Sequence, residues 1–263
     1  MYSVAASARP RFRLVWLLSL FSLALIFSLF RTIAHAASLD STVSAPLAQG
    51  IVVRYVDSDA PTGSPDGLSW ATAYTNIQDA MAHAATLVPT VTVEIWVAEG
   101  IYYPDIGIGQ SNNSISSTFS LKTDVELYGG FVGNETTRDQ RNWTARRTVL
   151  SGDVDGDGTS SNNALHVVTG NNVTSKAILD GFIITGGNAS GSSCPQACGG
   201  GVYNDNGLET LTNLLIVGNR AKHGGGMYNF NSSRPTINNL IFDGNIASGD
   251  GGAQPNNGLH LTP

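Results

Sequence analysis

The feature that most constrains the fold is an internal repeat near the C-terminal end of this 263-residue chain. The segment 199–204 (Gly-Gly-Gly-Val-Tyr-Asn) recurs as 224–229 (Gly-Gly-Gly-Met-Tyr-Asn) with an offset of 25. The segment 212–219 recurs as 238–245 with an offset of 26, so one residue is inserted between the copies. A period of roughly 20 to 50 residues is typical of solenoids and other repeat architectures.

Each repeat contains short β-type segments, and the sequence therefore predicts an all-β fold, a parallel β-helix. At about 3.3 Å per residue, one turn of this length can pass through three short strands and return one strand spacing higher. Asn219 and Asn245 occupy matching turn positions, where stacked asparagines can form hydrogen bonds along the axis. A leucine-rich repeat is less favoured, because the units lack its leucine spacing. The aliphatic pairs expected to stack are Leu214 on Leu240 and Ile216 on Phe242.

One amphipathic helix is predicted in the N-terminal part, after a strand over residues 51–56. Thr75 is its expected N-cap, with Gln78 completing a capping box, and Pro89 ends it. We expect the helix to cover the open end of the sheet stack. Residues 91–98 alternate between apolar and other side chains, which predicts a half-buried strand. The side chains expected on the buried face of the helix are Ile77, Met81, Ala84 and Ala85.

The first 36 residues have the layout of a secretory signal peptide. Three arginines precede an apolar run over 14–30, and Ala34-His35-Ala36 matches a cleavage site. An uncleaved membrane anchor is the alternative, since the run has the length of a short spanning helix. The chain then divides into a signal peptide (1–36), a flexible linker (37–50), an N-terminal strand and capping helix (51–90), β-helix coils (91–252) and a disordered tail (253–263).

Cleavage would leave a strongly acidic, exported protein. It removes four of the 14 basic residues and none of the 20 acidic ones, which leaves a formal charge of −10. This charge disfavours nucleic acid and anionic membrane surfaces as partners, because both require clustered cations. In an oxidising compartment Cys194 and Cys198 are expected to form a disulfide, whereas a zinc site would need a second pair of ligands.

Several motifs resemble a known family. Residues 70–80, 95–104, 128–136, 140–143, 148–153 and 179–189, together with the Gly-Gly-Gly-Met-Tyr-Asn unit, resemble bacterial pectin-lyase-like right-handed β-helix proteins. The later Phe242 to Asn245 spacing is similar to the repeat of polymorphic outer-membrane proteins. The resemblance covers about residues 51–252 and implies an exported surface protein, usually without an assigned activity. This chain stops just after the repeat start Gly251-Gly252, so we expect a truncated product.

One motif indicates a metal site. Asp153, Asp155 and Asp157 match the start of a calcium loop, in which alternate carboxylates of a tight turn converge on a hard cation. Ala164 stands where such a loop needs a bidentate glutamate, so a solvated acidic turn is the favoured interpretation. Calcium is the one cofactor that the sequence suggests.

Catalytic residues are harder to find. A polysaccharide lyase or glycoside hydrolase needs converging carboxylates and a base, and no pair here has distinctive spacing. Tyr203 and Tyr228 share a repeat position and could bind sugar rings, but packing between turns is favoured. We therefore expect a non-enzymatic protein of the cell surface or medium, used for adhesion or glycan contact, with a pectin-lyase-like enzyme or its remnant as the alternative. The residues considered for catalysis are Arg234, Asp243, Asp250, His166 and His223.

Overall fold

The computed structural model describes residues 50–61, 63–249 and 259–261 of the chain. All of them belong to one compact unit that spans Gln49–Pro263. The predicted signal peptide, the predicted linker except Gly50, and the predicted tail except the backbone of 259–261 lie outside the described residues. Within the described ranges, no helix is both long and apolar enough to cross a bilayer.

Strands form most of the regular structure, with one α-helix in the described part, α2 (Ile77–Leu87), and two 3-10 turns, η1 (Trp70–Thr72) and η2 (Arg138–Gln140). The strands are β1 (Gly50–Val56), β2 (Val91–Ala98), β3 (Gly100–Tyr102), β4 (Phe119–Ser120), β5 (Val125–Phe131), β6 (Thr148–Ser151), β7 (Val168–Asn171), β8 (Ile178–Asp180), β9 (Ile183–Thr185), β10 (Asn188–Ala189), β11 (Val202–Asp205), β12 (Thr210–Val217), β13 (Arg220–Ala221), β14 (Met227–Phe230), β15 (Thr236–Asp243), β16 (Ile246–Ala247) and β17 (Leu259–Leu261).

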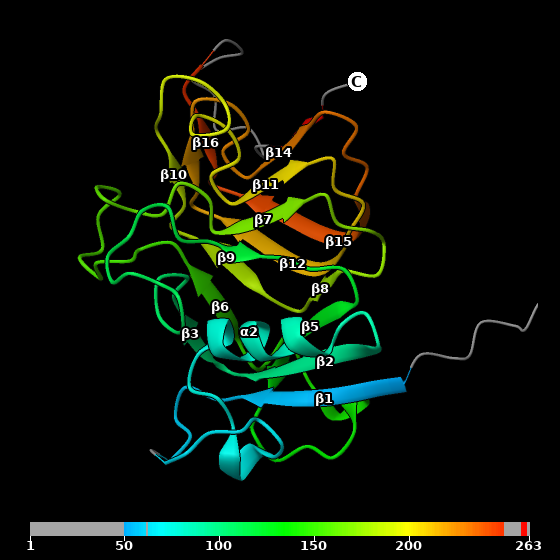
Figure 1. Cartoon of the computed structure of the whole chain (residues 1–263). Coiled ribbons are helices and arrows are strands. Elements are labelled where there is room, and N and C mark those ends of the chain that lie inside the picture. The colour runs from blue at the N-terminus through cyan, green and yellow to red at the C-terminus, as the bar shows by residue number, and fades with distance from the viewer. Residues whose placement is uncertain (1–49, 62, 250–258, 262–263) are drawn as a thin grey trace, which may run out of the picture. The chain divides into compact units, whose positions relative to one another are not determined.

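The strands form three parallel sheets, as Figure 1 shows. The largest has nine strands, in which β1, β2, β5, β8, β12 and β15 pair in succession, while β3, β6 and β9 continue the same layer. A second sheet joins β4, β7, β11, β14 and β17, and a third joins β10, β13 and β16. The prediction of an all-β parallel fold with little helix is confirmed.

The repeat pairs in register as the sequence predicts. In β12 and β15, Leu214 pairs with Leu240 and Ile216 with Phe242. The offset between partners is 25 for β11 with β14, and 26 for β12 with β15. The inserted residue therefore lies in the turn between β14 and β15, and it leaves the strand register intact.

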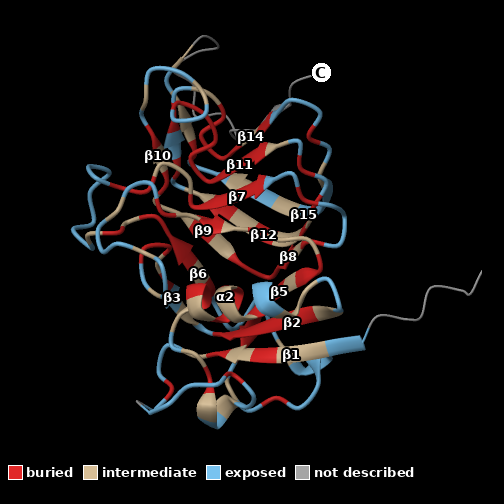
Figure 2. Cartoon of the chain, in the orientation of Figure 1, coloured by how far each residue is buried: buried red, intermediate tan, exposed pale blue. Residues whose placement is uncertain are grey.

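The main core lies between the sheets, and Figure 2 shows buried residues concentrated along β2, β7 and β11. It runs from Val56 and helix α2 through β2, β5 and β12 to Met227 of β14. Apolar residues at alternate positions fill it, because successive side chains of a strand point to opposite faces. At the β15 edge, Leu240 and Phe242 pack against this core while remaining only partly buried.

The prediction of a half-buried β2 is wrong, because both faces of this strand are covered. Trp96, Tyr128 and Phe131 form a second cluster on the outer face, to which Trp70 and Tyr55 also pack. The rings of Trp96 and Phe131 stack with centroids 4.9 Å apart. The loop that precedes α2 brings Trp70 over this face, and the Trp70 Nε1–H donates to the Glu135 carbonyl (2.9 Å).

Helix α2 packs against β1 and β2 and ends before Pro89. Its N-cap is Asn76, whose side chain accepts from the Asp79 N–H, so the prediction of Thr75 is wrong. The Gln78 amide instead donates to the carbonyls of Pro104 and Thr118. Ala85, expected on the buried face, is exposed. Ala80 is buried on that face instead.

The predicted asparagine stack is present at the turn after β12. Asn219 and Asn245 are both completely buried, and the Asn219 Nδ2–H donates to Asn245 Oδ1 (3.0 Å). Asn219 Oδ1 accepts from the Gly187 N–H, and its amide also donates to the Ile184 carbonyl. A Cβ added at Gly187 would collide with the Gly200 carbonyl. Gly187 is thus required where its turn lies directly against the next one.

Candidate functional site

A groove on the outer face of the nine-stranded sheet is the clearest candidate for a binding site. Its volume is about 250 Å³, and the segment 143–147 forms one wall above strands β9, β12 and β15. We call it the Trp143 groove. It is lined by Trp143, Thr144, Arg147, Gly181, Phe182, Ile183, Asn213, Leu214, Leu215, Asn239 and Ile241.

Two glycines let the wall approach the sheet. A Cβ on Gly130 would lie 2.5 Å from Trp143 Cα, and a Cβ on Gly181 would lie 2.9 Å from Trp143 Cβ. Both glycines also have a positive φ, which other residues rarely adopt. The Gly-Gly-Phe and Asp-Gly-Phe motifs of the sequence therefore position Trp143 against the strands.

A buried ion pair fixes the same wall. The Arg141 guanidinium donates to the Asp180 carboxylate (2.5 Å) and to the carbonyls of Gly129 and Asp180. The exposed fractions of the two side chains are 13% and 11%. Breaking such a pair leaves one charge without compensation, so the pair holds the wall in place.

A row of amides extends from this ion pair across successive strands. Asn213 Nδ2–H donates to Asp180 Oδ1 (2.8 Å), and Asn239 Nδ2–H donates to Asn213 Oδ1 (2.8 Å). Both asparagines have a positive φ, which asparagine tolerates better than most residues. Their matching repeat positions are the sequence signal that could have identified this row, although the sequence analysis did not single out the groove.

The chemistry of the groove suits binding. Trp143 has an exposed fraction of 37% and offers an aromatic surface. Arg147 is exposed, and it takes part in none of the ion pairs found in the described part of the chain. None of the described lining residues is Asp, Glu or His, so the groove contains amide and cationic donors and no side chain suited to general acid–base catalysis.

The structure brings the three aspartates of the acidic loop together. One carboxylate oxygen from each of Asp153, Asp155 and Asp157 lies within 4.8 Å of the others. Asp153 Oδ1 and Asp155 Oδ1 are buried without a hydrogen-bond partner, whereas the Asp157 carboxylate accepts from Thr159. Converging carboxylate oxygens of this kind fit a hard cation such as Ca²⁺. Calcium binding at this loop stays a prediction.

The two tyrosines of the repeat pack between turns. Tyr203 and Tyr228 stack with ring centroids 6.3 Å apart, and His166 stacks on the other side of Tyr203 at 5.0 Å. Tyr203 is only 4% exposed, because the loop closed by the Cys194–Cys198 disulfide covers it. Burial raises the pKa of Tyr203 to about 12. This arrangement favours packing over sugar binding at Tyr203.

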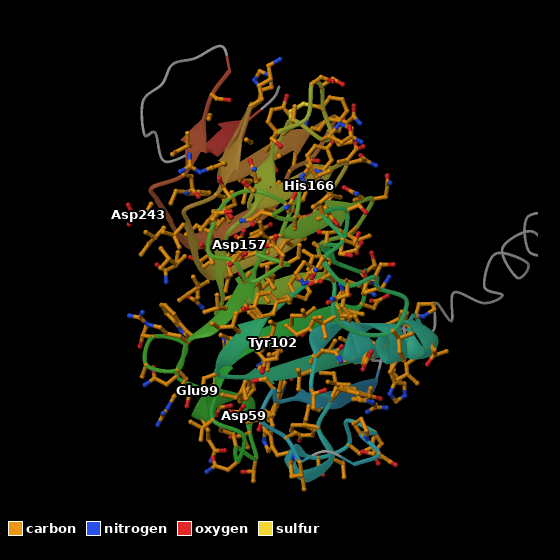
Figure 3. The ribbon with its side chains drawn as sticks, turned by 90° about the vertical axis from the view of Figure 1, so that its left-hand side faces the viewer. Asp59, Glu99, Tyr102, Asp157, His166 and Asp243 are labelled. Carbon is orange, nitrogen blue, oxygen red and sulfur yellow. A yellow bond between two sulfur atoms is a disulfide. The ribbon has the colours of Figure 1, made fainter. Side chains whose placement is uncertain are left out.

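The residues considered for catalysis do not converge. Burial lowers the pKa of His166, whose Nδ1 donates to the Gly199 carbonyl (3.0 Å). Figure 3 shows His166 and Asp243 on opposite sides of the molecule. His223 is half-buried beside Cys198, Arg234 is exposed after β14, and Asp250 lies outside the described residues. No hydrogen bond or ion pair found in the described ranges joins any two of these side chains.

Comparison of the chain with models of known families, with curated proteins and with solved structures finds no match. The function of the chain is therefore inferred from the geometry and chemistry of the Trp143 groove.

Proposed function

We propose that this chain is an exported right-handed parallel β-helix that contacts glycans at a cell surface or in the medium and has no enzymatic activity. The Trp143 groove is the proposed contact site. The observation that carries the proposal is the composition of this groove, in which an aromatic ring, an arginine outside the described ion pairs and a row of amides lie together on a rigid sheet.

The parallel β-helix is supported by the sheet pairing. Strands of successive turns pair in parallel in each of the three sheets, and between the last two turns the paired residues are offset by 25 or 26. Crossovers between parallel strands of one sheet are almost always right-handed, which favours the right-handed form. Export is supported by the signal-like sequence of residues 1–36 and by the disulfide.

Glycan contact follows from the chemistry of the groove. Aromatic rings bury the apolar faces of sugar rings, while amides and guanidinium groups form hydrogen bonds with hydroxyl groups. Asn213 and Asn239 place one polar side chain on each of β12 and β15 along the floor. An extended polysaccharide that crosses β12 and β15 would therefore meet a similar amide donor on each of them.

The proposal is tested with a panel of immobilised polysaccharides and two matched arginine variants. Trp143→Ala should weaken binding about tenfold or more, since an aromatic contact contributes on the order of 1 kcal/mol beyond its buried area. Arg147→Ala should also weaken binding. Arg146→Ala is the control, because this neighbour pairs with Glu99 outside the groove. Equal binding by all four proteins would reject the groove as the contact site.

A polysaccharide lyase is the second candidate, and one hollow favours it. Asp153 and Arg220 both line a cavity of about 360 Å³ beside the acidic loop. A lyase needs acidic residues that hold calcium together with a basic residue. An assay for unsaturated uronides, run with added Ca²⁺ over the same panel, distinguishes the two functions. Product formation that disappears in Arg220→Ala would establish the enzyme.

A further inference from the structure

Glu209, directly before β12, is a completely buried residue, and neither of its carboxyl oxygens has a hydrogen-bond partner. Its backbone carbonyl accepts from the Thr236 N–H (2.8 Å), which fixes the residue between adjacent turns. A buried ionised carboxylate without donors is strongly unfavourable, because nothing replaces the water that the charge has lost. A group of this kind requires a physical explanation.

A second unpartnered oxygen lies beside it. Asn204 is completely buried, and its Oδ1 accepts no hydrogen bond, while its Nδ2–H donates to Asn229 Oδ1 (2.8 Å). One turn back, the residue paired with Asn204 is Gly170, which has no side chain. A Cβ at Gly170 would lie 2.6 Å from Asn204 Oδ1 and 2.7 Å from Glu209 Oε2. The two side chains therefore converge on the space that Gly170 leaves open.

No described cation compensates the carboxyl group. The connecting segments beside Glu209 carry charged side chains, among them Asp205, Lys176, Asp124 and Arg234. The Asp205 carboxylate accepts from the Asn231 amide, Lys176 pairs with Asp124 (3.0 Å), and Arg234 is exposed. Burial raises the pKa of Glu209 to about 7. The backbone of Glu209 itself is the one cause that lowers this pKa. No charged side chain is among the causes of this shift.

We propose that Glu209 is a neutral carboxylic acid in the folded protein below neutral pH, that it donates its proton to Asn204 Oδ1, and that the stability of these turns is thereby coupled to protonation. One proton gives the carboxyl group a donor and satisfies the orphaned amide oxygen at once. It also extends the side-chain row to three members, in which Glu209 donates to Asn204 and Asn204 donates to Asn229.

The direction of the pH dependence follows from linkage. The folded protein binds this proton more tightly than the unfolded chain does, because the pKa of Glu209 is raised from 4.5 to about 7. The contribution to stability is complete below the unfolded pKa, and it is lost as the pH rises through the folded one. Between these two values, the folding equilibrium constant falls by up to about tenfold per pH unit.

The test uses Glu209→Gln, because the glutamine amide can donate to Asn204 at every pH. Urea unfolding is measured between about pH 5 and pH 8.5 for the wild type, for Glu209→Gln and for Glu99→Gln, an exposed surface control. Relative to wild type, Glu209→Gln should gain up to about tenfold in folding equilibrium constant per pH unit up to pH 7. It should be the more stable protein at pH 8, whereas Glu99→Gln should follow the wild type.

Parallel profiles for wild type and Glu209→Gln, with the variant less stable throughout, would overturn the proposal. That result means that the carboxylate is ionised in the folded protein and is held by a bound cation or by a donor from Asn204. If Glu209→Gln does not fold, carbon NMR of wild-type protein labelled at the glutamate carboxyl carbon decides the question. One carboxyl that titrates near pH 7 supports the proposal, and titration of every glutamate near its ordinary pKa of about 4.3 refutes it.

Discussion

The two ends of the nine-stranded sheet hold adjacent strands together by different chemistry. Around β2 and β5, aromatic rings close the outer face, with Trp96 stacked on Phe131 and Trp70 packed beside them. In the turns from β11 to β15, asparagine rows and closely packed glycines take this role, and Asn219 hydrogen-bonded to Asn245 is the best example.

This difference explains why the repeat is visible in only part of the sequence. Aromatic and aliphatic side chains fill space, so residues of many shapes can serve at the same place. A hydrogen-bonded row needs the same amide at the same position of each turn, and a close backbone contact accepts only glycine. The turns built from Asn and Gly therefore repeat recognisably, whereas the aromatic end does not.

The largest expected effect comes from adding a side chain where two turns touch. A Cβ on Gly200 would collide with the Arg220 carbonyl and lie 2.9 Å from the Gly225 carbonyl. Gly200→Val should therefore abolish cooperative folding, measured by circular dichroism and urea titration. Gly50→Ala is the control at the aromatic end, because its nearest neighbour would lie 3.8 Å away. A stable Gly200→Val protein would show that these turns are not closely packed.

At the aromatic end, Trp96→Ala should cost about 3–5 kcal/mol of unfolding free energy, because it removes a buried ring from the outer cluster. Urea unfolding measures this loss. Trp143→Ala provides a matched tryptophan control, since that ring is 37% exposed. A loss below about 1 kcal/mol in Trp96→Ala would mean that the outer cluster contributes little to stability.

Among the amide rows, Asn219→Ala should cost about 2–4 kcal/mol, because it leaves the Gly187 N–H and the Ile184 carbonyl buried without their partner. Asn239→Gly is the control in an exposed row and keeps the positive φ available. It should cost less than about 1 kcal/mol. Equal losses in the two variants would show that burial does not distinguish the rows.

Calcium should give the smallest effect, at the acidic loop between β6 and β7. At about ten times its dissociation constant, Ca²⁺ should stabilise the fold by about 1.4 kcal/mol. Differential scanning calorimetry should then show a higher Tm for wild type and for Asp59→Asn, an exposed control, and no change for Asp155→Asn. An unchanged wild-type Tm at millimolar Ca²⁺ would favour the solvated acidic turn.

The sequence was sufficient for much of the fold. The repeat period correctly places Leu214 on Leu240, and the N-cap of the N-terminal helix, Asn76, directly follows the expected Thr75. The covered outer face of β2 could not be predicted, because Trp70 reaches it through a loop with no periodic pattern. Alternation reports one buried face and contains no information about loops that cover the other.

The candidate site was harder to predict than the fold. The acidic loop and the cysteine pair are local in sequence, so their proximity was evident. The Trp143 groove joins Trp143 to the distant Asn213 and Asn239, through the ion pair of Arg141 with Asp180. Such a site depends on how turns stack, and the register between strands brings its residues together.

The inserted residue between β14 and β15 has a consequence for how this chain can change. The strands on either side keep their pairing although the connecting segment is one residue longer than its earlier copy. Connections at this corner can therefore lengthen while the framework stays the same, so that new surface features can evolve one segment at a time. The constant spacing belongs to the strands, and the corners are where the molecule is open to variation.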